Sequence, residues 1–273
     1  MSFHLIAFQS SVLTSASVGV ALGAVADGYA FGSSTDGFML PKDMELIAAY
    51  ACSEFLDQAW IVAPSLRRVG YPYITPVQQN PAGYSTPYDP NLMELIRNPI
   101  MLKKGERLAA LARLTAAGGT DSGVVLLWLR AKPQPVPHGE AFWIPYTCDT
   151  SPATVANNWT SVPLTFDQTL PSGTYLVVGL DHYTERGIAA RVSCPGSFYR
   201  PGALVKGEVT GASAGRNHEL FYSDDLGVYG AFDTDAPPAI EVLATSAGIT
   251  AHTGYMRLIR VGDLGLAARY QCQ

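Results

Sequence analysis

Proline stands at every second position in residues 132–139, which read Lys-Pro-Gln-Pro-Val-Pro-His-Gly. Proline fixes its own φ angle and has no N–H to donate to a helix or a sheet, so this spacing predicts an extended, fairly stiff connector. The segment lies close to the middle of the 273-residue chain. We therefore expect two domains, residues 1–131 and 140–273, each long enough to bury a core of its own.

Several landmarks of the first stretch return in the second at a nearly constant distance. One offset held over roughly a hundred residues favours a tandem duplication over the alternative that any two all-β halves look alike. The paired landmarks are Pro41 and Pro171 (171 − 41 = 130), Pro64 and Pro195 (195 − 64 = 131), Pro72 and Pro201 (201 − 72 = 129), and Gly123 and Gly254 (254 − 123 = 131).

Short apolar and β-branched runs, separated by turn residues, predict an all-β chain. About eight such strands with little helix are typical of a jelly roll or a similar sandwich, and the first stretch gives the same count less cleanly. We therefore predict two tandem eight-stranded jelly rolls. The expected strands of the second stretch are 142–144, 164–166, 175–180, 188–193, 203–209, 226–232, 240–245 and 255–261.

Two apolar runs of the first stretch carry further expectations. Residues 44–51 fit a buried strand or a helix, and their counterpart at 174–180 is β-branched enough to favour the strand. Residues 124–129 are apolar at consecutive positions, which predicts a strand that is buried on both faces.

One short helix is expected in a long loop of the first stretch, from Pro90 to Arg97. Asp89 can cap its N-terminus, and Pro90 suits the first helical position. Pro99 would then end it.

The charge balance argues against dedicated nucleic-acid binding. The chain has 18 Lys and Arg against 23 Asp and Glu, a formal net charge of −5, and it lacks the basic stripe that such binding needs. The doublets Arg67-Arg68 and Lys103-Lys104 are expected in turns. Charged residues make up only 15% of the chain, against about 25% in an ordinary protein. So few charges suit a surface that is covered by neighbours.

The four cysteines, at 52, 148, 194 and 272, show no C-x-x-C spacing and predict free thiols in a reducing compartment. The first basic residue is Lys42, so no basic region of a signal peptide is recognisable. Serines and threonines interrupt residues 1–26, which therefore do not predict a membrane span. Without a secretory route, the glycosylation motif at Asn158 has no meaning.

Several sequence motifs for catalysis or ligand binding are lacking: there is no H-E-x-x-H, phosphate loop or EF-hand pattern. His138, in the connector, lacks the second histidine of a cupin-type H-x-H pair, and His218 lies in a polar loop. His4 and His252 have no partner nearby in the sequence. We therefore predict no catalytic, cofactor-binding or metal-binding residues.

Two acidic segments remain as weaker candidates. His182 stands beside Asp181 and Glu185, which predicts a surface charge cluster at a hairpin tip rather than an acid–base pair. The segment Asp233-Thr234-Asp235 offers too few oxygens for a specific calcium site, and a loop is the better interpretation.

Aromatic side chains gather in expected loops. A sugar-binding platform is one interpretation, and contact with a neighbouring subunit is the one we favour. These residues are Tyr71, Tyr73, Tyr84, Tyr88, Phe198 and Tyr199.

With these features the chain resembles the double jelly-roll major capsid proteins, the lineage that runs from adenovirus hexon to the coats of small tailless icosahedral bacteriophages. The likeness covers most of the chain and is best over residues 140–261. The segments that resemble the second roll of the small phage members are Leu170-Pro-Ser-Gly-Thr-Tyr-Leu-Val-Val-Gly, Tyr199-Arg-Pro-Gly, Leu226-Gly-Val-Tyr-Gly and Ile240-Glu-Val-Leu.

The resemblance implies a structural protein, not an enzyme. Three copies would form a trimer with a pseudo-hexameric outline that tiles an icosahedral shell, and the protein would be made in the host cytoplasm and end in the virion. Its implied partners are further copies of itself and minor or vertex capsid proteins. Weak, non-specific contact with the packaged genome or an internal membrane is also implied.

Two other classes of protein stay open at this point. One is a carbohydrate- or receptor-binding β-sandwich module of a phage fibre or a lectin. The other is a bicupin-like enzyme that has lost or hidden its metal site. Bound glycan would indicate the first, and stoichiometric metal the second.

Overall fold

The computed structural model of the protein describes residues 3–13, 20–27, 32–34, 37–52, 56–66, 73–75, 92–114, 121–131, 140–148, 153–184, 187–205, 228–244, 247–248 and 252–263. The expected connector, 132–139, lies outside these residues. Within them the chain is all-β, with no α-helix and with two short 3-10 turns, η1 (Pro64–Leu66) and η3 (Val261–Asp263).

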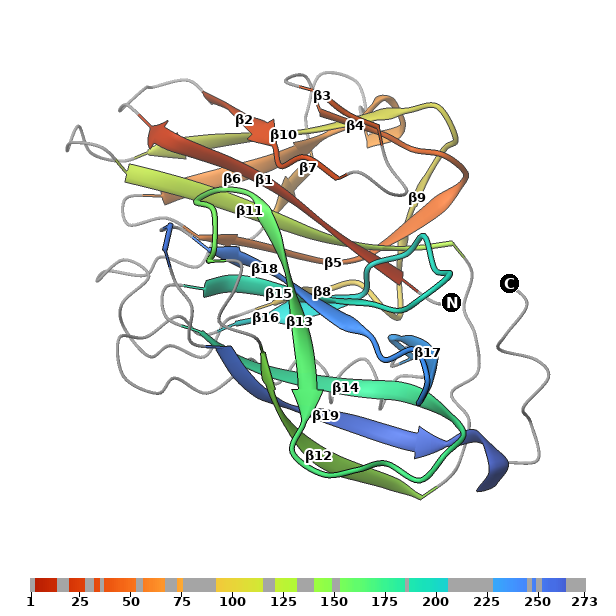
Figure 1. Cartoon of the computed structure of the whole chain (residues 1–273). Helices are drawn as coiled ribbons and strands as arrows, with labels where there is room; N and C mark the ends of the chain where they lie inside the picture. Colours follow the sequence, from red (N-terminus) through yellow and green to blue (C-terminus); the bar gives the residue numbers. More distant parts are fainter. Residues whose placement is uncertain are drawn as a thin grey trace. The chain divides into compact units, whose positions relative to one another are not determined.

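The chain divides into two compact units (Figure 1). The N-terminal unit is Leu5–Lys132. The C-terminal unit is Pro133–Gln273 together with Met1–His4. The first strand therefore contributes its first residues, Phe3 and His4, to the C-terminal unit and the rest of its length to the N-terminal one.

In the N-terminal unit, the strands form two antiparallel rows that are joined by the pairing of β1 with β2. One row runs β2-β10-β6-β7, and the other runs β1-β11-β5, with both β8 and β9 paired to β5. The β3–β4 hairpin adds to β10. The strands are β1 (Phe3–Leu13), β2 (Val20–Ala24), β3 (Gly32–Ser34), β4 (Gly37–Met39), β5 (Met44–Cys52), β6 (Leu56–Val62), β7 (Tyr73–Thr75), β8 (Met93–Glu94), β9 (Ile100–Leu102), β10 (Arg107–Leu114) and β11 (Asp121–Arg130).

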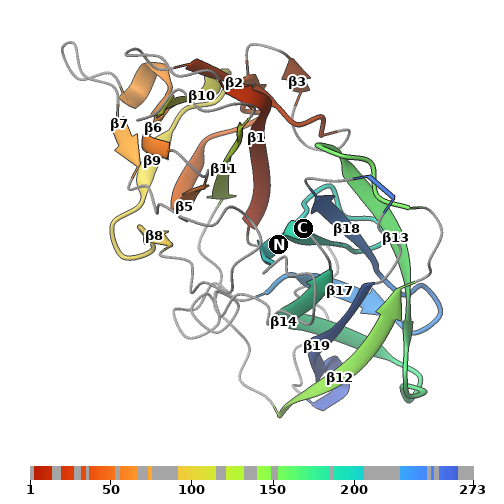
Figure 2. The ribbon, with the colours of Figure 1, turned by 90° about the vertical axis from the view of Figure 1, so that its left-hand side faces the viewer.

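The C-terminal unit contains one antiparallel path of eight strands, in the order β16-β15-β18-β13-β12-β19-β14-β17. β13 pairs with β18 through residues 159–163 and with β12 through residues 164–166, so it passes from one row of four strands to the other. Figure 2 shows β12, β19 and β14 next to one another. The strands are β12 (Ala141–Cys148), β13 (Trp159–Phe166), β14 (Thr174–Thr184), β15 (Gly187–Ser193), β16 (Gly202–Leu204), β17 (Gly230–Asp233), β18 (Ala239–Ala244) and β19 (His252–Arg260).

Strand pairing in the two units also agrees in register. Glu45 pairs with Arg130, and Tyr175 pairs with Arg260, so both partners are displaced by 130 residues (175 − 45 and 260 − 130). Ala59 pairs with Thr75, and Ala189 pairs with Leu204, which are displacements of 130 (189 − 59) and 129 (204 − 75). The two units therefore share strand register as well as strand order.

Strand β11 is the centre of the N-terminal core. Residues 124–129 have no exposed surface, as the consecutive apolar pattern predicted. β5, which pairs with β11, is buried at Met44 and from Leu46 to Ala49, so the strand interpretation of residues 44–51 is confirmed. Around these strands the apolar side chains interlock, for example Phe8 edge-on against Phe38 with ring centroids 5.2 Å apart.

The helix expected from Pro90 to Arg97 is wrong over the residues described. Met93–Glu94 forms the short strand β8 against β5, and the Leu95 N–H donates to the Ile47 carbonyl at 2.8 Å. A turn follows, closed by the Asn98 N–H on the Leu95 carbonyl at 2.9 Å. A two-turn helix is too short to be stable alone, and the open edge of β5 offers its backbone groups better partners.

Trp128 is the largest fully buried side chain among the described residues. We expect Trp128→Ala to lower the free energy of unfolding by about 3 to 5 kcal/mol, because the packed core can collapse only in part into the cavity. Met101→Ala is the matched control on β9, since Met101 is half exposed, and its effect should stay within about 0.5 kcal/mol. Denaturant unfolding followed by circular dichroism measures both, and equal effects would contradict this description of the core.

Candidate functional site

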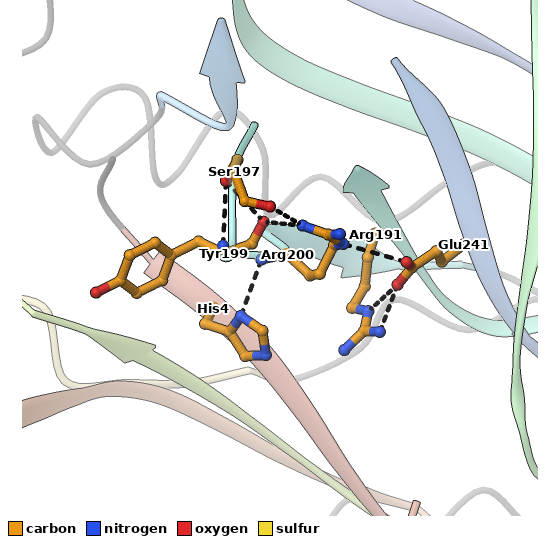
Figure 3. A network of polar contacts seen from close by, with 6 residues as sticks. All are labelled: His4, Arg191, Ser197, Tyr199, Arg200 and Glu241. Atoms are coloured by element: carbon orange, nitrogen blue, oxygen red, sulfur yellow. Dashed lines mark hydrogen bonds and ion pairs between the residues drawn. The ribbon is translucent and has the colours of Figure 1, made fainter. Parts of the chain in front are cut away.

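The most connected group of buried polar side chains lies in the C-terminal unit and is drawn in Figure 3. Arg191 on β15 and Glu241 on β18 pair directly across the sheet, and Arg200 comes from the segment that follows β15. Their exposed fractions are 1%, 2% and 4%. We call these three residues, with His4, Ser197 and Tyr199, the ionic network.

Glu241 is the centre of the network. Its Oε2 accepts a hydrogen bond from Arg191 Nε at 2.9 Å and a second from the Nη2 of the same guanidinium. Its Oε1 accepts from Arg200 Nε at 3.1 Å. One carboxylate thus serves two guanidinium groups, which is the arrangement that makes a buried charge tolerable.

Arg200 ties the network to the backbone. Its Nη1 donates to the carbonyl oxygens of Ser197 at 2.5 Å and Tyr199 at 3.0 Å. Its own backbone N–H donates to Nδ1 of His4 at 2.8 Å (Figure 3). Because Nδ1 accepts this bond it carries no proton, so a neutral His4 carries its proton on Nε2.

The Arg191 guanidinium also lies over an aromatic ring. Its Cζ is 3.9 Å from the centroid of the Trp159 ring, on β13, which is a close cation–π contact. The hydrogen bonds of Arg200 fix the segment from Ser197 to Arg200 in place. The pairs between Glu241 and the two arginines do not suit proton transfer, since a guanidinium stays charged at all ordinary pH.

The N-terminal unit has an apolar pair where the C-terminal unit has this ion pair. Ile61 pairs with Ala110 on β6 and β10, at positions displaced by 130 and 131 residues from Arg191 and Glu241 (191 − 61 and 241 − 110). Both residues of the apolar pair are fully buried. The ionic network is therefore a feature of one unit and not of the shared fold.

A second buried polar cluster joins β12, β14 and β19. The Tyr146 hydroxyl lies 2.8 Å from His182 Nδ1, and the rings of His182 and His252 are stacked with centroids 5.8 Å apart. Burial lowers the pKa of His182 to about 3, with a further contribution from the nearby His252. Burial also raises the pKa of Tyr146 well above its ordinary value.

The surface charge cluster predicted at His182 is wrong. His182 lies inside β14, which continues to Thr184, and is only 1% exposed. Strand alternation turns its side chain into the core, whereas Asp181 faces the other way. Glu185, His138 and His218 lie outside the described residues. His4 and His252 lack partners nearby in the sequence. His4 finds its partner at Arg200, in the segment after β15, and His252 finds its partner at His182 on β14.

The acidic segment at Asp233 forms a turn. The Asp233 carboxylate accepts hydrogen bonds from Thr174 Oγ1 at 3.2 Å and from the Asp235 N–H at 3.3 Å. Over the described ranges, no three His, Cys, Asp or Glu side chains are placed to hold a metal ion. Cys148 and Cys194 are free and buried, and burial raises the pKa of each thiol to about 12.

An aromatic patch on the outer face of β12, β14 and β19 was not found from the sequence. Trp143 is 40% exposed, with the Arg257 guanidinium 5.9 Å from its ring centroid, and Tyr255 is 44% exposed. The half-buried Tyr183 lies edge-on to Tyr255 at 6.3 Å. We call Trp143, Tyr183 and Tyr255 the aromatic face. The signal was the local alternation of these strands, in which each of the three stands next to a buried residue, namely Ile144, His182 or Met256.

Of the aromatic loop residues singled out in the sequence, Phe198 is 72% exposed. Tyr199 is half-buried, and its ring centroid is 6.2 Å from that of His4. Tyr71, Tyr84 and Tyr88 lie outside the described residues.

Comparison with known proteins gives no match: no family model, no curated protein and no solved structure matches this chain. In the part of the chain that the structure describes, no helix has the length and apolar character needed to cross a membrane. The strand pairing and the exposed surface are therefore the observations that bear on function.

Glu241→Gln tests how much the ionic network contributes to the free energy of unfolding. Glutamine keeps the shape but leaves two buried guanidinium groups without their shared carboxylate, so we expect a loss of about 3 to 5 kcal/mol of unfolding free energy. Asp43→Asn is the control, because it removes one partner of the exposed Asp43–Lys103 pair and should hardly move the unfolding midpoint. Denaturant unfolding measures both variants, and a Glu241→Gln protein as stable as the wild type would refute the role given to Glu241.

Proposed function

We propose that the protein is a major capsid protein with a double jelly-roll fold. In a jelly roll, eight strands lettered B to I in chain order form two sheets, B-I-D-G and C-H-E-F. Read in chain order, β12 to β19 of the C-terminal unit give the rows β12-β19-β14-β17 and β13-β18-β15-β16. These two rows have the lettered orders of a jelly roll, which supports the assignment.

The N-terminal unit supports the same assignment. With β1, β2, β5, β6 and β7 as B to F, β8 and β9 together as G, and β10 and β11 as H and I, its rows have the same orders. The β3–β4 hairpin is then an insertion between C and D. The observation that carries the proposal is the repeated register, in which Glu45–Arg130 and Tyr175–Arg260 are equivalent pairs.

Two rolls of the same fold in one chain are suited to symmetric assembly. Three copies would place six similar rolls in one ring, which is the pseudo-hexameric trimer that the resemblance implies. Such trimers would tile an icosahedral shell in the virion, with vertex or minor capsid proteins as further partners. Each trimer would carry a net charge of −15 (3 × −5). Because a nucleic acid is also negative, contact with a packaged genome would be weak and non-specific. Any contact with an internal membrane would be weak and non-specific as well.

The exposed apolar surface supports self-association. Trp143 and Tyr255 lie on adjacent strands of the aromatic face, and each leaves about two fifths of its surface in solvent. Aromatic side chains of this kind are enriched where subunits meet. The low fraction of charged residues, 15%, leaves few groups to keep such surfaces apart.

The oligomeric state tests the proposal. Mass photometry of the purified chain in neutral buffer should show particles of about 88 kDa (3 × 29.2 kDa) or larger assemblies. Tyr255→Glu should shift the distribution toward the monomer, because it would bury a charge at the interface. Val155→Glu is the matched control, since Val155 is 54% exposed but lies outside the aromatic face, and it should leave the distribution unchanged.

Two outcomes would contradict the proposal. A stable monomer at micromolar concentration excludes a shell protein, and a stable dimer does not fit three-fold assembly. Circular dichroism of the variants separates loss of assembly from loss of folding.

A carbohydrate- or receptor-binding module is the second candidate, and the aromatic face is the observation that favours it. Flat aromatic rings flanked by Arg257 and Asp181 also suit a sugar, because rings stack on its apolar face and charged groups bond its hydroxyls. A glycan array decides between the two. Specific glycan binding by a monomer that loses it on Trp143→Ala would support the module and count against the capsid protein.

A further inference from the structure

Three neighbouring strands bring Tyr146, Gly254 and His182 into one row. Tyr146 on β12 pairs with Gly254 on β19, and Gly254 pairs with His182 on β14. A Cβ at Gly254 would lie 2.6 Å from the Tyr146 hydroxyl oxygen and 2.2 Å from the Asp181 carbonyl oxygen. The missing side chain therefore lets the Tyr146 hydroxyl reach across the middle strand to His182 Nδ1, at 2.8 Å.

His252 completes the cluster. It precedes Gly254 by two residues on β19 and therefore faces the same side of the sheet. Its ring is stacked on that of His182 at 5.8 Å with an angle of 22° between the planes. The two histidines are 1% and 2% exposed. Two titratable rings are thus held face to face inside the sandwich.

The hydrogen bonds around His182 fit a neutral ring. The Tyr146 hydroxyl oxygen lies 2.8 Å from Nδ1 and 3.3 Å from the Asp181 carbonyl oxygen, and its one proton can serve either acceptor. In both arrangements Nε2 of His182 is buried and has no hydrogen-bond partner among the described residues. When Tyr146 donates to Nδ1, the neutral ring already carries its proton on Nε2, so an added proton goes to Nδ1 and turns the Tyr146 hydroxyl away toward the Asp181 carbonyl. When Tyr146 donates to Asp181 instead, the added proton goes to Nε2, where nothing described accepts it. In either case the buried ring gains a positive charge.

Among the residues that the structure describes, the charged and titratable groups nearby do not compensate such a charge. β12 contributes Tyr146 and Cys148, and β19 contributes His252. Asp181 and Tyr183, on β14 itself, face the opposite side of the sheet by strand alternation.

The row of strands on the other side of the sandwich, β13, β15, β16 and β18, carries two charged side chains, Arg191 and Glu241. They are bonded to each other, and Glu241 is bonded also to Arg200. Neither is therefore placed to balance a proton on His182.

We propose that His182 and His252 form an acid-sensitive latch in the C-terminal unit. In neutral solution the uncharged His182 ring stacks on His252 and bonds to Tyr146, which holds β12, β19 and β14 together around Gly254. In acid, protonation of His182 puts a positive charge beside His252, and no buried side chain among the described residues is placed as its counter-charge. The three strands then open at this point and expose the cluster to water.

The direction of the pH effect follows from the lowered pKa of His182, which falls from 6.5 to about 3 on folding. The unfolded form binds the proton more readily, so the neutral ring favours the folded form fully above pH 6.5. This stabilisation is lost as the pH falls from 6.5 toward 3. Each pH unit in that window raises the ratio of open to closed molecules up to about tenfold.

Hydrogen exchange followed by mass spectrometry tests the latch on the full-length protein. Between pH 7.5 and 5.0, after correction for the intrinsic exchange rate, protection of β14 and β19 should fall by up to about thirtyfold, since 1.5 units lie below pH 6.5. Strands β5 and β11 are an internal control in the same sample. They are the counterparts of β14 and β19 in the N-terminal unit and contain no histidine, so their protection should not change.

Variants separate the latch from general instability. His182→Gln removes the titrating ring and still offers Tyr146 an acceptor, so the fall in protection on acidification should disappear. Val178→Ala, at a buried position of the same strand, should lower protection equally at both pH values and keep the fall. His4→Gln, at the other buried histidine of the unit, should also keep it.

Two results would overturn the proposal. One is level protection of β14 in the wild type from pH 7.5 to 5.0, and this test stands even if His182→Gln fails to fold. The other is a fall that persists undiminished in His182→Gln or that vanishes in His4→Gln instead.

Discussion

Backbone pairing between strands that lie far apart in the sequence holds each unit together. β5 bonds to β11, and β14 bonds to β19, in each case across most of the length of the shorter strand. Both ladders contain one irregularity, at Trp128/Leu129 in the first and at Val177/Gly179 in the second. In each ladder the last strand of the unit pairs with one from much earlier in the chain, so these ladders provide long-range backbone contacts in both units.

The two units share their strand pairing but bury different side chains. At one equivalent position the N-terminal unit buries Ile61 against Ala110, and the C-terminal unit buries Arg191 against Glu241. Buried polar groups add little to stability compared with apolar ones, but they specify one arrangement, because any other leaves them without partners. The ionic network and the histidine pair therefore make the C-terminal unit the more specialised of two units with one strand order.

The sequence predicted the all-β class and the strands for a simple physical reason. Runs such as 124–129 and 174–180 are apolar or β-branched over lengths that only strands use, and the repeat offset resolved the ambiguity of residues 44–51. The helix at Pro90 to Arg97 failed because capping signals describe local preference, while the edge of β5 offered long-range hydrogen bonds to the same residues.

The buried clusters could not be predicted, because their members meet only through strand pairing. Arg191 and Glu241 are 50 residues apart, and Tyr146 and His182 are 36 apart. His182 was placed at the surface because its sequence neighbours are acidic, although alternation along β14 turns those neighbours away from it. The aromatic face was missed for the related reason that Trp143 and Tyr255 belong to strands whose other side is core.

We propose that one chain contains two equivalent rolls that assemble as a shell subunit. A cryo-electron microscopy map of the assembled protein tests this most directly. The account predicts capsomers with a pseudo-sixfold outline, in which each chain contributes two rolls and Glu45–Arg130 superposes on Tyr175–Arg260. Capsomers without that outline, or rolls in which β5–β11 and β14–β19 pair in different registers, would contradict it.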